Sequence, residues 1–289
     1  MLALIRWLSH RSLRFLHLWG GVAGWCTWAL SPSYRRRLTQ NAHVAGVSVR
    51  DRRASVAEAG RLILEIPRLW SRPADQPIAD PVRWEGAQLI DQAIEAGRGL
   101  VLLTPHLGSF EVAGQAYAQT FGPRQPMTVL YRPARQPWLR QWEDGARARP
   151  HLATAPATLA GVRQLLRALK RGETLGLLPD QVPPEGQGVW SPFFGKPAYT
   201  MTLAARMVRQ TGAAVLCLWC ERLPQGRGYV VRVSAMAHPL PHVGEGSESA
   251  VDDEACALAV NRSMEALILQ CPSQYLWGYH RYKTPRGVP

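Results

Sequence analysis

The segment best suited to chemistry is Thr104-Pro-His-Leu-Gly-Ser-Phe-Glu111. It follows a continuous apolar run, residues 99–104, and it opens a predicted helix. His106 therefore stands where ligands collect in α/β proteins, at the carboxyl end of a buried strand. Glu111 falls in the first turns of the helix, so its carboxylate can turn back toward the imidazole. A carboxylate on one ring nitrogen fixes the tautomer and raises the basicity of the other. The spacing predicts a general base for a hydroxyl group, against the alternative of two solvated loop residues.

Other chemical patterns in the sequence are poorer. Ser109 lies near His106, but there is no G-x-S-x-G elbow, no Walker A motif and no G-x-G-x-x-G after a strand. Cys217-Leu-Trp-Cys220 lies in a predicted strand, where an offset of three puts the side chains on opposite faces. Two core thiols are therefore favoured over a metal or redox pair. His238-Pro-Leu-Pro-His242 has metal-like spacing, but its prolines favour a loop.

The elements that must hold His106 alternate along the chain. We expect strands at 82–85, 99–104, 126–131, 174–178, 213–221 and 229–233, and helices at 35–72, 86–96, 109–120, 159–171, 200–211 and 251–270. This alternation predicts an α/β fold with a mostly parallel central sheet flanked by helices. A polar, Pro-rich break near residues 71–81 suggests three parts, namely an N-terminal segment 1–34, a helical connection 35–80 and a catalytic domain 81–289.

The N-terminal segment has a membrane-like composition. Residues 15–34 contain no Asp, Glu, Lys or Arg, and Arg35-Arg-Arg37 follows at once. Trp7, Trp19, Trp25 and Trp28 stand close to several arginines. Two interpretations remain open, a single N-terminal membrane helix or a basic helix that lies in the membrane interface.

Composition bounds the partners more than the fold. The 289 residues carry 34 Lys+Arg and 21 Asp+Glu, a net charge of +13, and a mean hydropathy of −0.15 that excludes a polytopic membrane protein. A strongly basic chain suits nucleic acid, an anionic membrane surface, a phosphorylated substrate or an acidic protein. The five cysteines form no disulfide framework, which suits a reducing compartment. The aromatic and basic residues 275–283 are interpreted as a docked tail, with a nucleic-acid platform as the alternative.

Taken together, these segments resemble the lipid A biosynthesis branch of the glycerolipid acyltransferases, the lauroyl/myristoyl acyltransferases. His106-Leu-Gly-Ser-Phe-Glu111 resembles the H-x4-D/E motif of that superfamily. The later motifs agree in order and rough spacing, and they are Tyr131-Arg-Pro133, Pro179-Asp-Gln181, Phe193-Phe-Gly195, Ala198-Tyr-Thr200, Thr211-Gly-Ala213, Gln274-Tyr-Leu-Trp277 and Arg281-Tyr-Lys283.

The resemblance implies roles for four residues. His106 matches the catalytic histidine and Glu111 its carboxylate partner. Arg132 matches an arginine that holds a substrate phosphate, and Asp180 stands where this branch has an important aspartate. The implied reaction is transfer of a fatty acyl chain from acyl carrier protein to a hydroxyl of a lipid A precursor, with backbone N–H groups near Gly108 holding the oxyanion. No cofactor and no metal are implied.

The same resemblance implies a setting for the enzyme. Its partners would be acyl carrier protein, the lipid A precursor and inner-membrane lipids, with no nucleic acid. The catalytic domain would lie on the cytoplasmic face of the bacterial inner membrane. One alternative is an acyltransferase of the same fold that acts on a lysophospholipid or another glycolipid. A second is a basic, membrane-tethered protein that binds nucleic acid.

Overall fold

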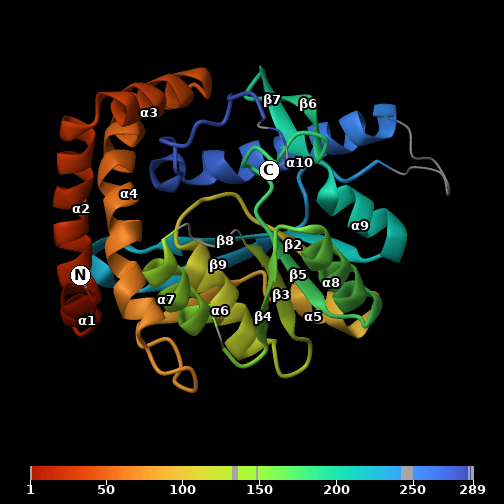
Figure 1. The fold of residues 1–289 in the computed structure, drawn as a ribbon, viewed down its shortest axis with the longest axis horizontal. Helices are drawn as coiled ribbons and strands as arrows, with labels where there is room; N and C mark the ends of the chain where they lie inside the picture. The colour runs from red at the N-terminus through yellow and green to blue at the C-terminus, as the bar shows by residue number, and fades with distance from the viewer. Residues whose placement is uncertain (1, 132–135, 148, 242–249, 286, 288–289) are drawn as a thin grey trace.

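A computed structural model describes residues 2–131, 136–147, 149–241, 250–285 and 287 (Figure 1). It contains a seven-stranded sheet in the order β1-β9-β8-β2-β5-β3-β4. All neighbouring strands run parallel except β8 and β9, which pair antiparallel. The predicted α/β class with a mostly parallel central sheet is confirmed. The strands are β1 (Val82–Glu85), β2 (Leu100–Leu103), β3 (Met127–Tyr131), β4 (Leu152–Pro156), β5 (Thr174–Leu177), β8 (Ala214–Arg222) and β9 (Tyr229–Ser234).

Strand β2 occupies the centre of this sheet, as its unbroken apolar run predicts. All four of its residues are buried, and it pairs in parallel with β8 on one side and β5 on the other. Parallel pairing brings the carboxyl ends of β2 and β5 to the same edge of the sheet. The loops that follow Leu103 and Leu177 are therefore neighbours.

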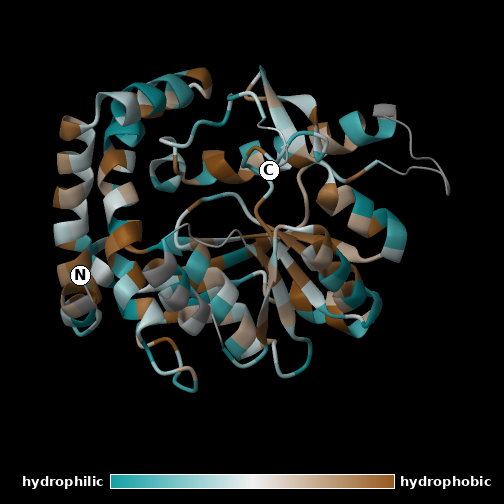
Figure 2. Cartoon of the chain, viewed as in Figure 1, coloured by the Kyte–Doolittle hydropathy of each residue, from teal (hydrophilic) through white to brown (hydrophobic). Residues whose placement is uncertain are grey.

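Two hydrophobic cores cover the two faces of the sheet. Helices α8 (Leu159–Lys170), α9 (Leu203–Thr211) and α10 (Ala250–Gln270) pack on one face, and α5 (Gln88–Glu95) and α6 (Phe110–Thr120) pack on the other. Helix α7 (Pro137–Arg147) lies beside β4. Figure 2 shows the apolar residues concentrated along the central strands and on the helix faces turned toward them.

Some elements differ from the sequence prediction. The helix expected from Thr200 begins at Leu203, because β7 (Lys196–Met201) forms a hairpin with β6 (Gly188–Phe193). The single helix expected over 35–72 is two helices, α3 (Pro32–Val44) and α4 (Val49–Trp70). Ser48 ends the break between them and caps α4, accepting a hydrogen bond from the N–H of Asp51.

The N-terminal segment forms α1 (Leu2–Ser9) and α2 (Leu13–Leu30), and the predicted membrane-spanning helix is not found. No helix of the described residues combines the length and apolarity that crossing a bilayer requires. The physical reason is composition, since α2 is rich in Gly and Trp and contains a buried histidine. Gly20 and Gly24 let α2 approach α4 very closely at Gly60, where an added Cβ would collide with backbone carbonyl groups. Figure 1 shows α2 and α4 side by side at one end of the molecule.

Candidate active site

His106 lies in the loop after β2, and its imidazole faces Asp180 in the loop after β5. Nδ1 of His106 is 2.7 Å from Oδ1 of Asp180, and the backbone N–H of His106 donates to Oδ2 at 3.0 Å. The histidine side chain is 16% exposed and the aspartate 2%. The ring of Phe110 contacts the imidazole edge-on, with centroids 5.0 Å apart. Asp180 thus fixes both the backbone and the ring of the histidine.

The carboxylate of Asp180 is held in its charged form. Burial acts to raise its pKa, but the charge of His106 and the two hydrogen bonds from that residue outweigh burial and lower the pKa below its usual value. The buried guanidinium of Arg281 acts in the same direction. Because an ionised carboxylate only accepts hydrogen bonds, Nδ1 of His106 carries a proton.

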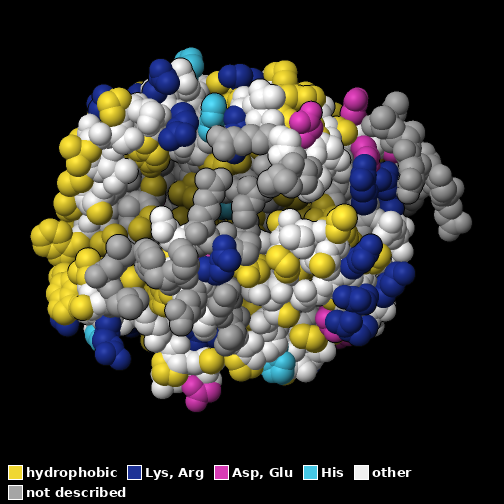
Figure 3. All heavy atoms as spheres, viewed as in Figure 1, with side chains coloured by type: hydrophobic (Ala, Val, Ile, Leu, Met, Phe, Trp, Pro, Cys, Tyr) yellow, Lys and Arg dark blue, Asp and Glu magenta, His cyan; other side chains and the backbone are white. Residues whose placement is uncertain are grey.

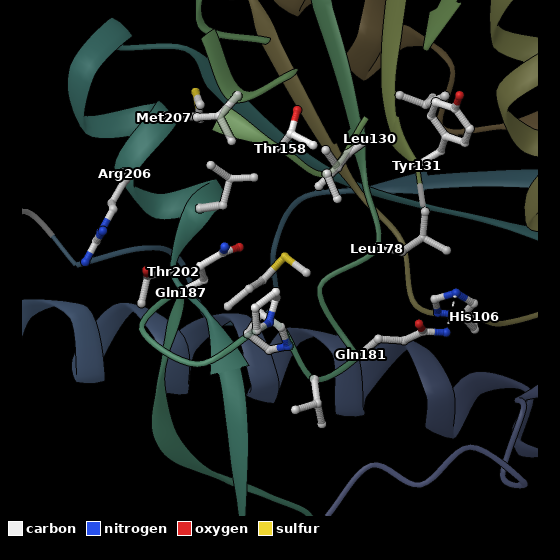
Figure 4. Close-up of a pocket in the computed structure, with 18 of the residues that line it drawn as sticks. His106, Leu130, Tyr131, Thr158, Leu178, Gln181, Gln187, Thr202, Arg206 and Met207 are labelled. Atoms are coloured by element: carbon white, nitrogen blue, oxygen red, sulfur yellow. Dashed lines mark hydrogen bonds between the residues drawn. The ribbon is translucent and has the colours of Figure 1, made fainter. Parts of the chain in front are cut away.

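The second ring nitrogen faces Gln181. Nε2 of His106 is 2.9 Å from Nε2 of Gln181 (Figure 4). In the neutral ring with a proton on Nδ1, the other nitrogen is an acceptor, so the Gln181 amide donates to it. This is the tautomer that a general base needs, with its lone pair directed away from the carboxylate.

Glu111 does not hold the imidazole in this structure. It lines the same cavity as His106, but its Oε2 accepts a hydrogen bond from Nε1 of Trp70 at 3.1 Å. The predicted hydrogen bond between Glu111 and His106 is absent from the part of the chain that the structure describes, and Asp180 takes that place. Strand order explains this difference. The carboxyl ends of the parallel strands β2 and β5 are neighbours, which brings Asp180 to His106, whereas the Glu111 carboxylate contacts Trp70 of α4. Whether Glu111 is required for activity stays a prediction.

The backbone of the His106 loop is closely tied to its neighbours. The N–H of Gly108 donates to the carbonyl of Gln274 at 3.0 Å, and the N–H of Ser109 donates to that of Cys220 at 2.8 Å. Gly108 has a φ of +62°, and a Cβ there would collide with the Cys220 carbonyl. These two N–H groups are already satisfied and cannot hold an oxyanion in this conformation. An oxyanion hole formed by other N–H groups near the start of α6 stays a prediction.

A buried charge network supports this loop from behind. Glu65 of α4 accepts hydrogen bonds from Ser109 Oγ at 2.6 Å and from Arg222 Nε and Nη2, both at 2.9 Å. His17 of α2 and Tyr229 of β9 also contact it, each at 3.2 Å. Burial acts to raise the Glu65 pKa, but the charge of Arg222 and these hydrogen bonds lower it to about 2. Ser109 is fully buried and its hydroxyl donates to Glu65, so it is not available to act as a nucleophile.

A cavity of about 660 Å³ extends away from His106. Figure 4 places His106 and Gln181 at one end and Arg206 and Met207 of α9 at the other. The apolar side chains that line the cavity come from β3, β7, α8, α9 and the residue after β5, and they are Val129, Leu130, Val162, Leu178, Met201 and Leu203. Figure 3 shows this face of the molecule hollowed near its middle. Arg132, the predicted phosphate ligand, lies outside the described residues.

The structure also describes most of the other motifs named from the sequence. Cys217 and Cys220 are buried and belong to the cores on opposite faces of the sheet, as predicted. The described residues include no cluster of His, Cys, Asp and Glu that could hold a metal ion, and His242 lies outside them. The C-terminal residues dock as predicted, with Tyr275 and Trp277 buried and the N–H of Leu276 donating to the carbonyl of His106 at 3.1 Å.

Comparison with known proteins assigns the family. The model of bacterial lipid A biosynthesis acyltransferases matches residues 48–284 of the chain. The chain belongs to this family. The match includes the His106 loop, the Asp180–Gln181 pair and α4.

Individual relatives agree with the assignment of the chain to the lipid A acyltransferase family. The lipid A biosynthesis lauroyltransferase of Escherichia coli K12 is 29% identical over 252 residues, which cover 84% of this chain and 76% of the relative. The lipid A biosynthesis palmitoleoyltransferase of the same organism is 27% identical over 242 residues, covering 82% and 74%. A lipid A biosynthesis acyltransferase of Haemophilus influenzae is 26% identical over 192 residues, covering 66% and 56%.

Sequence reasoning missed three functional relationships. It placed Asp180 in the site but did not predict that its carboxylate holds the imidazole. It gave Gln181 and the buried Glu65 no role. The order of Pro179-Asp-Gln181 directly after a predicted strand was the available signal for the first two, whereas Glu65 looks like any polar position on an amphipathic helix.

Proposed function

We propose that this family member transfers a fatty acyl chain from an acyl carrier protein to a hydroxyl group of a lipid A precursor. The observation that carries the proposal is the state of His106. One ring nitrogen is fixed by Asp180, and the other faces a mostly apolar cavity. That arrangement suits a general base beside an acyl-binding space.

The reaction follows from the position of the base. Nε2 of His106 takes the proton of the acceptor hydroxyl as its oxygen attacks the thioester carbonyl carbon. The carbonyl electron pair moves to oxygen and forms a tetrahedral oxyanion. When the C–S bond breaks, the leaving thiolate takes the proton from the imidazolium. The oxygen ester and the free thiol of the carrier are the products, and Asp180 stabilises the imidazolium in between.

Two further residues belong to this proposal. Glu111 contributes a second negative charge to the cavity wall, which favours the imidazolium during the reaction. Arg132 binds a phosphate of the acceptor, as arginine does through two parallel N–H groups. The net charge of +13 raises the encounter rate with an acidic carrier and with a phosphorylated acceptor.

The cavity is the proposed site of the acyl chain. Its apolar middle stretch leads from His106 toward α9, so a chain with its thioester at His106 would extend toward Met207. Such a pocket removes the hydrocarbon from water and holds the carbonyl at the base.

We also propose that the enzyme sits on the cytoplasmic face of the bacterial inner membrane, with α2 in the interface plane. Leu18, Trp19, Val22 and Trp25 form an exposed apolar stripe on α2, each at least 41% exposed. Figure 3 shows hydrophobic side chains gathered along the edge of the molecule where α1 and α2 lie. Exposed Arg6, Arg14 and Arg36 flank the stripe, and such a basic, aromatic helix suits anionic head groups.

The experiment that tests the function is a reconstituted transfer assay. Purified protein is mixed with acyl-carrier thioesters and a lipid A precursor, and the products are identified by mass spectrometry. We expect one added acyl chain that depends on the carrier thioester. Transfer only to a lysophospholipid or another glycolipid, together with unchanged lipid A in a deletion strain, would favour the alternative acceptor.

A further inference from the structure

We propose that Gln181 is a catalytic residue that first occupies the place of the acceptor hydroxyl and then donates to the oxyanion. In the empty enzyme the Gln181 amide is hydrogen-bonded to Nε2 of His106, and the incoming acceptor hydroxyl displaces this amide. The released N–H group then turns to the thioester carbonyl oxygen. The inference rests on the proposed acyl transfer and adds the group that stabilises its transition state.

The position of Gln181 is the first observation. Its Nε2 lies 2.9 Å from Nε2 of His106, which is the atom that must receive the hydroxyl proton. The side chain is half-buried and lines the cavity, and Figure 4 shows its amide directed at the imidazole. Any hydroxyl that reaches the base must therefore take the place of this amide.

The anchoring of the neighbouring backbone is the second observation. Asp180 is almost fully buried and bonded twice to His106, and the N–H of Val182 donates to the hydroxyl of Tyr279 at 3.0 Å. Gln181 lies between these two fixed points. Its backbone stays in place while its flexible side chain is free to rotate about its own χ angles.

The supply of other donors is the third observation. An oxyanion of this kind requires N–H groups aimed at the developing charge. The backbone N–H groups of residues 106–109 donate to Asp180, Pro105, Gln274 and Cys220, so none of these four points into the cavity. Gln181 is a side-chain donor that already lies beside the reacting atom.

The chemical type of the residue fits this double role. A primary amide has two N–H donors and no charge in the pH range of the reaction. It therefore neither competes with His106 for the hydroxyl proton nor repels the oxyanion. The amide leaves and returns without any covalent step, and the proton balance of the transfer is unchanged.

The test uses two variants of nearly the same shape. Gln181→Met keeps the volume but removes the donor, and Gln181→Glu replaces the donor with a negative charge. We expect kcat to fall about 10²–10³-fold in Gln181→Met and further in Gln181→Glu, with KM for both substrates little changed. Gln164→Met is the matched control, because Gln164 is half-buried and donates to the carbonyl of Thr154, away from the cavity.

A pH profile separates this role from simple packing. The amide favours the neutral ring, so its loss moves the acidic limb of the kcat/KM profile to higher pH, and a carboxylate at this position moves it further. The pH of the acidic limb should therefore rise in the order wild type, Gln181→Met, Gln181→Glu. A packing role would leave the limb where it is.

Three results would overturn the inference. They are a wild-type kcat in either variant, a loss confined to KM, and an unmoved acidic limb. Thermal unfolding of each variant confirms that it is folded. His106→Ala is assayed in parallel, so that an active Gln181→Met beside an inactive His106→Ala refutes only the role of Gln181. An active His106→Ala refutes the proposed mechanism itself.

Discussion

Asp180 holds His106 by two atoms at once, with one carboxylate oxygen on the ring and the other on the backbone N–H, at 2.7 and 3.0 Å. Both residues follow adjacent parallel strands, β2 and β5, so the pair depends on the sheet and not on local sequence. Asp180 therefore keeps Nδ1 of His106 protonated and is placed to stabilise the imidazolium.

Replacing Asp180 with Asn should remove the charge and keep the shape. We expect kcat to fall about 10²–10⁴-fold, which is the usual contribution of a correctly poised base. Steady-state transfer kinetics measure the effect. Asp80→Asn is the control, because Asp80 pairs with Arg68 outside the cavity. An Asp180→Asn enzyme with the kcat of the wild type would show that the pair is only structural.

Trp70 offers a specific test of Glu111. Its indole N–H donates to Glu111, while its ring packs edge-on against Trp142 at 4.9 Å. Trp70→Phe should preserve the ring contact and remove this one hydrogen bond to the Glu111 carboxylate, lowering kcat by about tenfold, the equivalent of roughly 1.4 kcal/mol. Glu111→Gln should lower kcat by more. Full activity in Glu111→Gln would remove Glu111 from the mechanism.

The Glu65–Arg222 pair predicts how stability depends on pH. The Glu65 pKa of about 2 lies below the value of about 4.3 expected in the unfolded chain. The ionised Glu65 carboxylate therefore makes its full contribution to the free energy of unfolding above pH 4.3, and this contribution is lost as the pH falls toward 2. Glu65→Gln should cost about 3–5 kcal/mol near neutral pH, because it leaves Arg222 buried with less charge compensation.

Urea unfolding at a series of pH values checks this prediction. The difference in the free energy of unfolding between wild type and Glu65→Gln should shrink below pH 4.3 as the wild-type carboxyl takes up its proton. Asp80→Asn removes a partly exposed pair and should cost about 0–1 kcal/mol. A difference between wild type and Glu65→Gln that is constant over the whole series would contradict the assignment.

Gly108 tests the backbone of the histidine loop. Alanine there combines a left-handed φ of +62° with a collision against the Cys220 carbonyl, so the loop must move. We expect a loss of at least about 1–3 kcal/mol in stability and a large loss of kcat, measured by thermal unfolding and transfer kinetics. Gly145→Ala is the control, since a Cβ at that position in α7 meets open space. Equal behaviour of the two variants would show that the loop tolerates displacement.

The stripe on α2 predicts the mode of membrane contact. Trp19→Ser and Trp25→Ser should each weaken binding to vesicles of anionic phospholipid by about tenfold, because partial burial of a large apolar side chain contributes on the order of 1–2 kcal/mol. Vesicle flotation measures the change. Trp190→Ser is matched in exposure, at 49%, but lies in the β6–β7 hairpin and should bind normally. Equal losses in all three would exclude α2 as the contact.

The sequence predicted the fold where local pattern and tertiary environment agree. Leu100–Leu103 is apolar at every position because β2 is covered on both faces, and this also placed His106 at a strand end. The helix predicted from Thr200 began too early, because Ala198-Tyr-Thr200 is strand through its pairing with β6. A pairing partner far along the chain is invisible to local propensity.

The sequence predicted which residues form the site better than it predicted which of them contact one another. His106, Glu111 and Asp180 were all named from motifs, and the structure places all three near one another. Which carboxylate holds the ring depends on strand order, because β5 lies beside β2 while more than 60 residues separate their loops in the chain. The prediction of a membrane-spanning helix was wrong because α2 is not apolar enough to cross a bilayer, and its Gly20 and Gly24 instead allow close packing on α4.

Acyl transfer by His106→Ala tests most directly whether His106 is the general base of the reaction. The variant is compared with wild type and with His43→Ala, which changes an exposed histidine on α3 outside the cavity. We expect His43→Ala to behave as wild type, whereas His106→Ala should unfold at a similar temperature and transfer no acyl chain from the carrier thioester to the lipid A precursor. Turnover near the wild-type rate in a folded His106→Ala enzyme would contradict the role of His106 as the general base.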